Sequence, residues 1–250
     1  MAWLDKIHHP ERYIKTFLKW GILGLLMGAI GGLLGAGFHH ALHGVTHLRA
    51  EHTWLIFLLP LGGLLSVAIY RLLGLRSNRG TNEIIDAVLD GQELKPQIAP
   101  GIFLATSITH LLGGSAGREG AALQLGGSSA SVLAKLFRLK QEDRKILIMS
   151  GMSAVFAGLF GTPLTATLFC MEFESVGTVF SPALLPCYLA AFTAAKVSGA
   201  LGVHAETAEV ALAALTWGNV WKYVVLAVLL ALLGIAMCAL FHKAEHLAQR

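Results

Sequence analysis

Six long apolar stretches constrain this chain more than any other feature of its sequence. A helix needs about 20 apolar residues to cross a hydrocarbon core of roughly 30 Å, and most of the stretches reach that length. Only 14% of the 250 residues are charged, against about 25% in a typical soluble domain, so much of the surface is expected to face lipid. The sequence therefore predicts an all-α, multi-pass membrane protein. The stretches are Phe17–Phe38, Trp54–Leu73, Ile98–Leu112, Ile146–Met171, Ala183–Leu201 and Val220–Phe241.

The first helix is predicted to be unusually long and to pack closely on its neighbours. It covers Ile14–His47, which exceeds the bilayer thickness, so it must tilt or project. Gly24, Gly28 and Gly32 recur every four residues along it. Small residues at that spacing let helices approach closely in lipid, which favours a packing role for these glycines.

Other predicted helices are short or broken. The segment Asn82–Leu89 is too short to span, and Pro163–Phe173 follows a break at Gly161. Such pieces are typical of tilted, broken and re-entrant helices around a cavity. The remaining helices are predicted over Thr53–Leu73, Ile98–Leu112, Ser128–Phe137, Gln141–Phe160, Pro182–Gly202 and Asn219–Arg250.

The net charge of +4 is small and is spread over the segments between helices, which indicates no nucleic-acid partner. In membrane proteins such charges set the orientation, with basic loops on the cytoplasmic side. A basic run over Lys135–Lys145 falls on the opposite side if the glycine-rich segment before it re-enters, so the charge bias and a re-entrant path disagree there. The two clusters predicted to be cytoplasmic are Lys6, Arg12, Lys15 and Lys19, and Arg71, Arg76 and Arg79.

No cofactor and no metal site are expected from the cysteines and histidines. The cysteines lie inside apolar stretches without paired spacing, which is typical of small buried residues. His39, His43 and His47 fall on one helix face. Interfacial polar side chains are the preferred interpretation, and a metal-ligand row or a pH-sensing face are the alternatives. The cysteines are Cys170, Cys187 and Cys238.

The segment Gly113–Gly127 carries the most informative chemistry. It places Arg118 and Glu119 among glycines, between two apolar helices. Charges at membrane depth are costly and usually functional, and non-helical backbone survives there only where it lines a cavity. A helix that begins near Gly120 presents free N–H groups and the positive end of its dipole. Such a helix start is an anion site without a full positive charge.

Glu119 is predicted to lie directly before that helix start. When ionised, its carboxylate competes with a halide for the N–H groups; when protonated or displaced, it admits one. Glu119 is thus a candidate gate and proton carrier, and the alternative is an ordinary N-terminal helix charge at an interface. Arg118 either attracts anions by its field or anchors the helix at the interface.

These residues carry a resemblance to a known family. The segment Gly117–Gly120, with sequence GREG, resembles the G-[KR]-E-G-P motif of the CLC chloride channel and transporter family. The segments Leu123–Gly127, Phe137–Arg144 and Ala154–Phe173 are also similar to family sequence. The resemblance implies a homodimer with one pore per subunit, inverted repeats, and channel-like or proton-coupled halide movement in the plasma membrane. It also implies that Glu119 is the gating glutamate.

Two departures from the family pattern concern the anion. The family's G-S-G-I-P motif is expected just before Glu83, where this chain has Gly80-Thr81-Asn82 without the serine or the proline. Ala121 replaces the proline of the second motif. Such versions resemble the bacterial branch that exports fluoride, so fluoride competes with chloride as the expected ion. The candidate anion-binding residues are Gly80, Thr81, Gly117, Arg118, Gly120 and Ala121.

A third departure concerns protons. Proton-coupled members carry two glutamates after the helix that resembles Pro163–Met171. Glu172 fits the first, as a proton-path group or a plain interfacial charge, but Phe173 occupies the second position and Glu174 comes one residue late. Coupling through that second position is therefore not expected.

The chain is expected to be one transmembrane domain over residues 1–250, with a first repeat at about 14–202 and the start of a second at about 217–250. The family's G-x-F-x-P motif and its late tyrosine are absent, so a fragment of a full subunit is expected. Two other classes are weighed. One is an intramembrane serine hydrolase that uses Ser153 with a histidine such as His110, and the other is a non-conducting membrane scaffold. No glycine follows that serine and no orienting acid is identifiable, so an enzyme is not expected.

Overall fold

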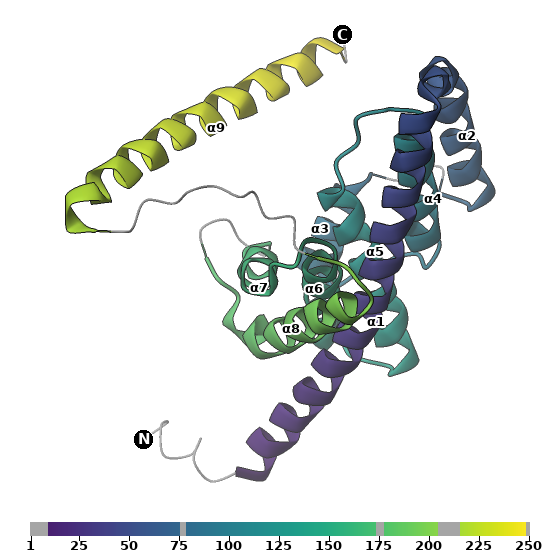
Figure 1. Ribbon diagram of the computed structural model, residues 1–250. Helices are drawn as coiled ribbons and strands as arrows, with labels where there is room; N and C mark the ends of the chain where they lie inside the picture. The colour runs from purple at the N-terminus through teal and green to yellow at the C-terminus, as the bar shows by residue number, and fades with distance from the viewer. Residues whose placement is uncertain (1–9, 76–78, 174–177, 205–215, 249–250) are drawn as a thin grey trace. The chain divides into compact units, whose positions relative to one another are not determined.

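The computed structural model describes residues 10–75, 79–173, 178–204 and 216–248, and it divides into two units, residues 1–206 and 207–250. Each unit is described by itself. Helices make up both units, and no β-strand occurs within the described ranges (Figure 1). The prediction of an all-α chain is confirmed.

The first unit contains helices α1 to α8, and most follow the predicted elements closely. Helix α5 does not, because it begins at Glu119 rather than at Ser128 and so includes much of the glycine-rich segment. The longest, α1, has 42 residues, which at 1.5 Å per residue gives about 63 Å, roughly twice a hydrocarbon core. The shortest, α3 and α7, have 10 and 9 residues and cannot span. The bounds are α1 Pro10–Glu51, α2 Leu59–Leu72, α3 Thr81–Asp90, α4 Ile98–Leu111, α5 Glu119–Leu136, α6 Gln141–Phe160, α7 Pro163–Met171 and α8 Leu184–Ala200, with short 3-10 turns at Thr53–Leu58 and Ser181–Ala183.

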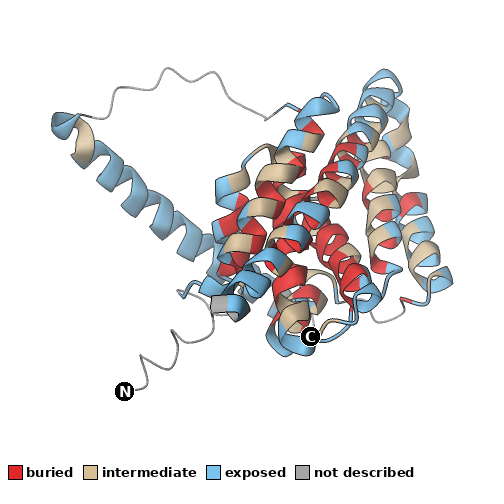
Figure 2. Cartoon of the chain, turned by 90° about the horizontal axis from the view of Figure 1, so that it is seen from below, coloured by how far each residue is buried: buried red, intermediate tan, exposed pale blue. Residues whose placement is uncertain are grey.

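The centre of this unit is the packing of α1, α6 and α8, whose facing sides are buried (Figure 2). The predicted glycine face of α1 lies against α8. A Cβ at Gly28 would lie 2.6 Å from the Cβ of Thr193, and one at Gly32 would lie 2.7 Å from the Cβ of Val197. The absence of these side chains lets the two backbones come close enough for continuous contact.

A second set of glycines seats α6 against its other neighbours. A Cβ at Gly31 would run into Ala154, so α1 contacts α6 on the side next to its α8 face. Gly126 and Gly151 face each other where α5 crosses α6, and a Cβ on either would strike the other's backbone. The middle of α5 is therefore held by close backbone contact with α6, most of whose residues are buried.

The chain runs along α4 toward the C-terminal end of α1, turns there, and returns along α5. Gly113, just after α4, lies beside Arg49 near the end of α1, with 2.9 Å between an added Cβ and the arginine Nε. After α5, Asp143 accepts a hydrogen bond from Lys19 near the start of α1, at 2.5 Å. The basic run between α5 and α6 thus lies at the same end of the unit as Lys19 of α1. Which side of a membrane this end faces stays a prediction.

Outward faces of the helices are apolar, as expected for a lipid-facing surface. Phe57 and Leu72 are more than four-fifths exposed. The described part of the second unit is a 3-10 turn at Trp217–Asn219 and α9, Val220–Ala248, whose apolar side chains are exposed along its length. Four described helical segments are long and apolar enough to cross a membrane: Tyr13–Glu51, Thr53–Leu72, Ser181–Ala200 and Trp217–Ala244.

Candidate functional site

Two helix starts meet at the predicted site. A Cβ added to Gly120, in the first turn of α5, would lie 2.9 Å from Oγ1 of Thr81, the first residue of α3. The chain thus brings together two segments that lie about forty residues apart in the sequence, and the glycine makes this approach possible.

Both helix starts present backbone N–H groups that no side chain caps. In α3, Gly80 is the N-cap, with φ 63° and ψ −136°, a conformation that favours glycine. In α5, Arg118 is the N-cap, and Ala122 N–H makes the first bond back to its carbonyl, at 2.9 Å. Two helix starts, each with the positive end of its dipole, therefore lie next to each other, an arrangement that suits a small anion.

The carboxylate of Glu119 folds back over the glycine before it. Its Oε2 lies 2.8 Å from where a Cβ of Gly117 would be. Glu119 is exposed and is the first residue of α5, whereas the sequence analysis placed it directly before the helix, so that detail was wrong. Because first-turn N–H groups have no partner within the helix, the carboxylate starts next to groups that also attract an anion.

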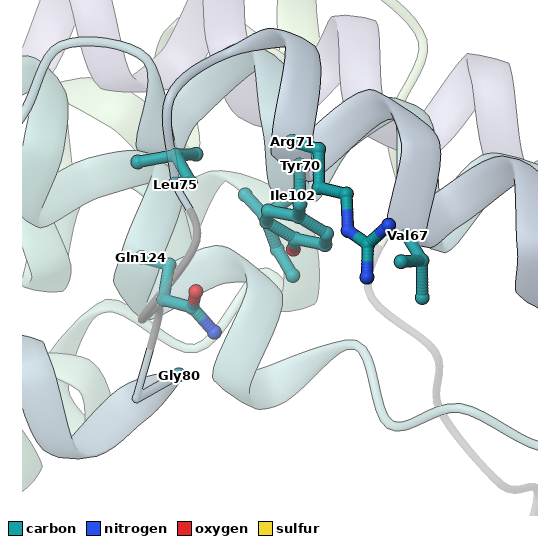
Figure 3. A pocket seen from close by; sticks show the side chains of 7 residues that line it. All are labelled: Val67, Tyr70, Arg71, Leu75, Gly80, Ile102 and Gln124. Carbon is teal, nitrogen blue, oxygen red and sulfur yellow. The ribbon is translucent and has the colours of Figure 1, made fainter.

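A hollow of about 440 Å³ opens beside the start of α3. Gly80 and Gln124 lie at one side, and Tyr70 and Arg71 of α2 lie at the other (Figure 3). Val67, Leu75 and Ile102 complete the lining. Of the lining residues, Gly80 is the N-cap of α3 and so directly precedes Thr81.

Gln124 is a polar residue that the sequence analysis did not single out as a site residue. It is 5% exposed, and its Oε1 has no hydrogen-bond partner within the described structure. A buried amide of this kind costs free energy unless a ligand or water completes its bonds. The available signal was its spacing, since Gln124 lies four residues after Gly120 and so shares its helix face, in an otherwise apolar run.

A second hollow, of about 330 Å³, lies between α1, the end of α4 and the residue before α5. Its polar lining is His39 and His43 of α1, Thr46, His110 of α4, and Arg118. Of the three histidines predicted on one face, His47 does not line the hollow. It pairs instead with Glu51, at 3.5 Å, an acidic partner that the sequence analysis overlooked.

The imidazoles in this hollow are close but do not form a metal cluster. The rings of His39 and His43 are nearly parallel, with centroids 6.3 Å apart. His110 Nε2 lies 3.1 Å from the carbonyl oxygen of Ala116, so it donates there and leaves Nδ1 available. No group of three ligating side chains with metal-site geometry occurs in the described residues. The metal-ligand alternative is therefore not supported.

The remaining candidates lie away from the two helix starts. Glu172 follows α7 and is exposed, and its proton role stays a prediction. Glu174 lies outside the described residues. Ser153 is fully buried in α6 and donates to the carbonyl oxygen of Cys187, at 3.3 Å. Since His110 bonds a backbone carbonyl elsewhere, the described contacts do not assemble the serine–histidine pair that a hydrolase needs.

Comparisons with known proteins agree with this arrangement. A family model described as voltage gated chloride channel matches residues 62–250. A Pseudomonas syringae protein named chloride/fluoride channel protein is 36% identical over 246 residues, which are 96% of this chain and 54% of that protein. An H(+)/Cl(-) exchange transporter of Vibrio campbellii is 28% identical over 189 residues, which are 66% of this chain and 40% of that protein.

Solved structures extend the agreement to the fold. A crystal structure of a CLC-type fluoride/proton antiporter superposes with a TM-score of 0.78 and 35% identity, over 87% of this chain and 55% of that one. A slow cyanobacterial Cl-/H+ antiporter, at 22% identity, TM-score 0.66 and 86% and 54% coverage, shares the fold. The chain spans about half the length of these relatives. With its two converging helix starts and a family match over residues 62–250, it belongs to the voltage-gated chloride channel (CLC) family.

Proposed function

We propose that this chain forms the anion-handling part of a CLC-type transporter that moves fluoride across the plasma membrane in exchange for protons, with chloride as the competing ion. The observation that carries the proposal is the meeting of the uncapped starts of α3 and α5 at Thr81 and Gly120. Two of the relatives carry fluoride in their names. This chain also has Gly80-Thr81-Asn82 in place of the usual serine motif, a departure that fits fluoride as the transported ion.

The anion would be held by backbone dipoles. Candidate contacts are the N–H groups around Thr81, Gly120 and Ala121, with Gly80 and Gly117 allowing close approach. Uncharged donors bind an anion without a full opposite charge, and weak binding of that kind permits release and therefore turnover. Arg118 would raise the anion concentration at the entrance.

Glu119 would act as gate and proton carrier. Its carboxylate already lies over Gly117 at the start of α5, where it competes with an anion for the same N–H groups. Protonation removes that competition. The ionised carboxylate and the anion would therefore occupy the same region in turn, and each exchange would move one proton in and one anion out. The position after α7 that carries the inner proton glutamate in proton-coupled members is Phe173 here, so Glu119 itself would carry the proton farther, with Glu172 as a further candidate on the path.

The same proposal covers the assembly. Helices α1 to α8, residues about 14–202, would be the first inverted repeat, and α9 would begin the second, from about residue 217. The complete gene product would be a homodimer, and it would act by transport and not as an enzyme. A non-conducting scaffold remains the second outcome of the test below.

The test is anion efflux from liposomes that contain the complete gene product, followed with fluoride- and chloride-selective electrodes. Fluoride efflux faster than chloride efflux is expected, with proton uptake recorded in parallel. Glu119→Gln should abolish proton coupling and flatten the dependence of the rate on pH. Glu142→Gln is the matched control, because Glu142 is an exposed carboxylate at the other end of the unit. No efflux of either ion would show that the proposal is wrong.

A further inference from the structure

Two serine hydroxyls tie the segment that follows α3 to the middle of α5. The backbone N–H of Leu94 donates to Oγ of Ser131, at 2.9 Å, and Oγ of Ser128 donates to the carbonyl oxygen of Lys95, also at 2.9 Å. Both serines are buried, and so is Leu94. The bonded residues are 37 and 33 positions apart in the sequence, so the bonds join separate parts of the fold. The transport proposal assigns neither serine a role.

Helix α5 thus meets α3 and the segment after it at two places along its length. At its start, Gly120 lies beside Thr81, the first residue of α3. Ser128 and Ser131 follow Gly120 by eight and eleven residues, which at 1.5 Å per residue is about 12 and 17 Å farther along α5. Helix α3 has 10 residues and is about 15 Å long. Together with the segment after it, α3 therefore bridges the two places.

We propose that Ser128 and Ser131 are positioning residues for the anion site. By holding the chain after α3, they fix how far α3 extends along α5 and therefore how far apart the two helix starts lie. This inference rests on the proposed function, since it concerns the place where the anion would be held. The attraction between an anion and a positive helix end weakens with distance. Closely spaced starts therefore favour fluoride, the smaller halide, because only they reach it from both sides.

Apolar packing between the two helices does not fix this register by itself. Ile84 of α3 lies against Gly127 of α5, with 3.1 Å between its Cγ2 and the place of an added Cβ. Such a contact is non-directional, so a methyl group can shift along a glycine surface at little cost. A hydrogen bond, in contrast, weakens steeply when its angle or distance changes. The two serine bonds are therefore the contacts that define one position of α3 along α5.

Other polar contacts at the end of α3 are less suited to this task. Glu93 pairs with Lys135 and Arg144, at 3.3 Å each, but its side chain is 46% exposed. Exposed ion pairs contribute little and are screened by salt. Arg144 also donates to the carbonyl oxygen of Gly91, at 3.0 Å, which ties α3 to α6. The buried serine bonds join the segment directly to the helix that carries the second start.

The experiment measures initial efflux rates from liposomes against fluoride and chloride concentration, with the complete gene product. Ser131→Ala leaves the N–H of Leu94 without its acceptor, and Ser128→Ala removes the other bond. Each should raise the half-saturating fluoride concentration about fivefold, the usual effect of one lost hydrogen bond on an equilibrium, and that of chloride less. Ser150→Ala is the matched control, because Ser150 is equally buried and donates within its own helix, to the carbonyl oxygen of Ile146, at 2.7 Å.

The outcomes separate the two proposals. If the unmodified protein moves neither ion, the transport function is wrong. If it moves an ion and both single variants keep the original half-saturation, the positioning inference is wrong and the transport function stands. A lower maximal rate alone has the same meaning, because a purely structural role changes the amount of folded protein and not half-saturation. A shift of equal size in Ser150→Ala or in Glu93→Gln would also overturn the inference, since neither change touches the two serine bonds.

Discussion

A methyl group at Gly28 should loosen the packing of α1 on α8. The Cβ of Gly28→Ala would lie 2.6 Å from the Cβ of Thr193 and 2.7 Å from the carbonyl oxygen of Ala190. Ordinary contact begins at 3.4 Å, so the helices must separate by about 0.8 Å at this point. A gap of that size removes about a quarter to a half of the dispersion attraction between the atoms on its two sides.

The free energy follows from two opposing effects. Overpacking of this kind costs about 1–3 kcal/mol, while alanine is about 1 kcal/mol better than glycine in a helix. Gly28→Ala is therefore expected to lower the free energy of unfolding by up to about 2 kcal/mol. Gly37→Ala is the matched control, because Gly37 is on the same helix and an added Cβ there meets nothing within 4 Å.

The assay is reversible unfolding of the complete gene product in mixed micelles, with sodium dodecyl sulfate as denaturant. Trp20 on α1 is buried, so its fluorescence reports the loss of packing. The control should be neutral or stabilised. If Gly28→Ala proves as stable as Gly37→Ala, close contact between these backbones does not stabilise the fold and the reasoning is refuted.

Three further outcomes are expected. Gly80→Ala forces a residue with a side chain to φ 63°, at a cost of about 1–2 kcal/mol. It should slow efflux per folded protein, because it displaces the start of α3. An unchanged rate would show that this helix start does not bind the anion. Ser153→Ala should keep full transport and lower the free energy of unfolding by about 1 kcal/mol or less, since only the hydrogen bond from the serine hydroxyl to a backbone carbonyl is lost. Loss of transport would show that this serine has a functional role. Glu93→Gln removes ion pairs to Lys135 and Arg144, and the stability loss, about 0–1 kcal/mol in urea or detergent unfolding, should vanish at 1 M salt.

Helix positions were largely predictable because lipid allows few alternatives. Backbone groups in hydrocarbon must bond within their own helix, so apolar length alone marks the spans. The predicted helix over Ile14–His47 became Pro10–Glu51, and the break at Gly161 separates α6 from α7 as expected. Glycine spacing on α1 also indicated close packing correctly, although only coordinates show that Gly28 faces α8 and Gly31 faces α6.

The candidate site was predictable in part. Local sequence predicted a helix start near Gly120 and a short helix over Asn82–Leu89, which the structure begins at Thr81. It did not indicate the buried Gln124 or the histidine-lined hollow. Those depend on which faces of α1, α4 and α5 meet, and helix faces are matched by side-chain packing over distant residues rather than by local pattern.

By itself, the sequence determined that this chain is a bundle of membrane helices and that Gly117–Gly120 begins one of them, since hydrophobic length and local backbone preferences act within a few turns. Only the tertiary structure decided that Thr81 meets Gly120, that three imidazoles share one hollow with Arg118, and that the basic run after α5 returns to the end of the unit where α1 begins. These relations join residues far apart in the chain, and they are selected by glycine-permitted contact between whole helices, a property of the assembled bundle that no single segment carries.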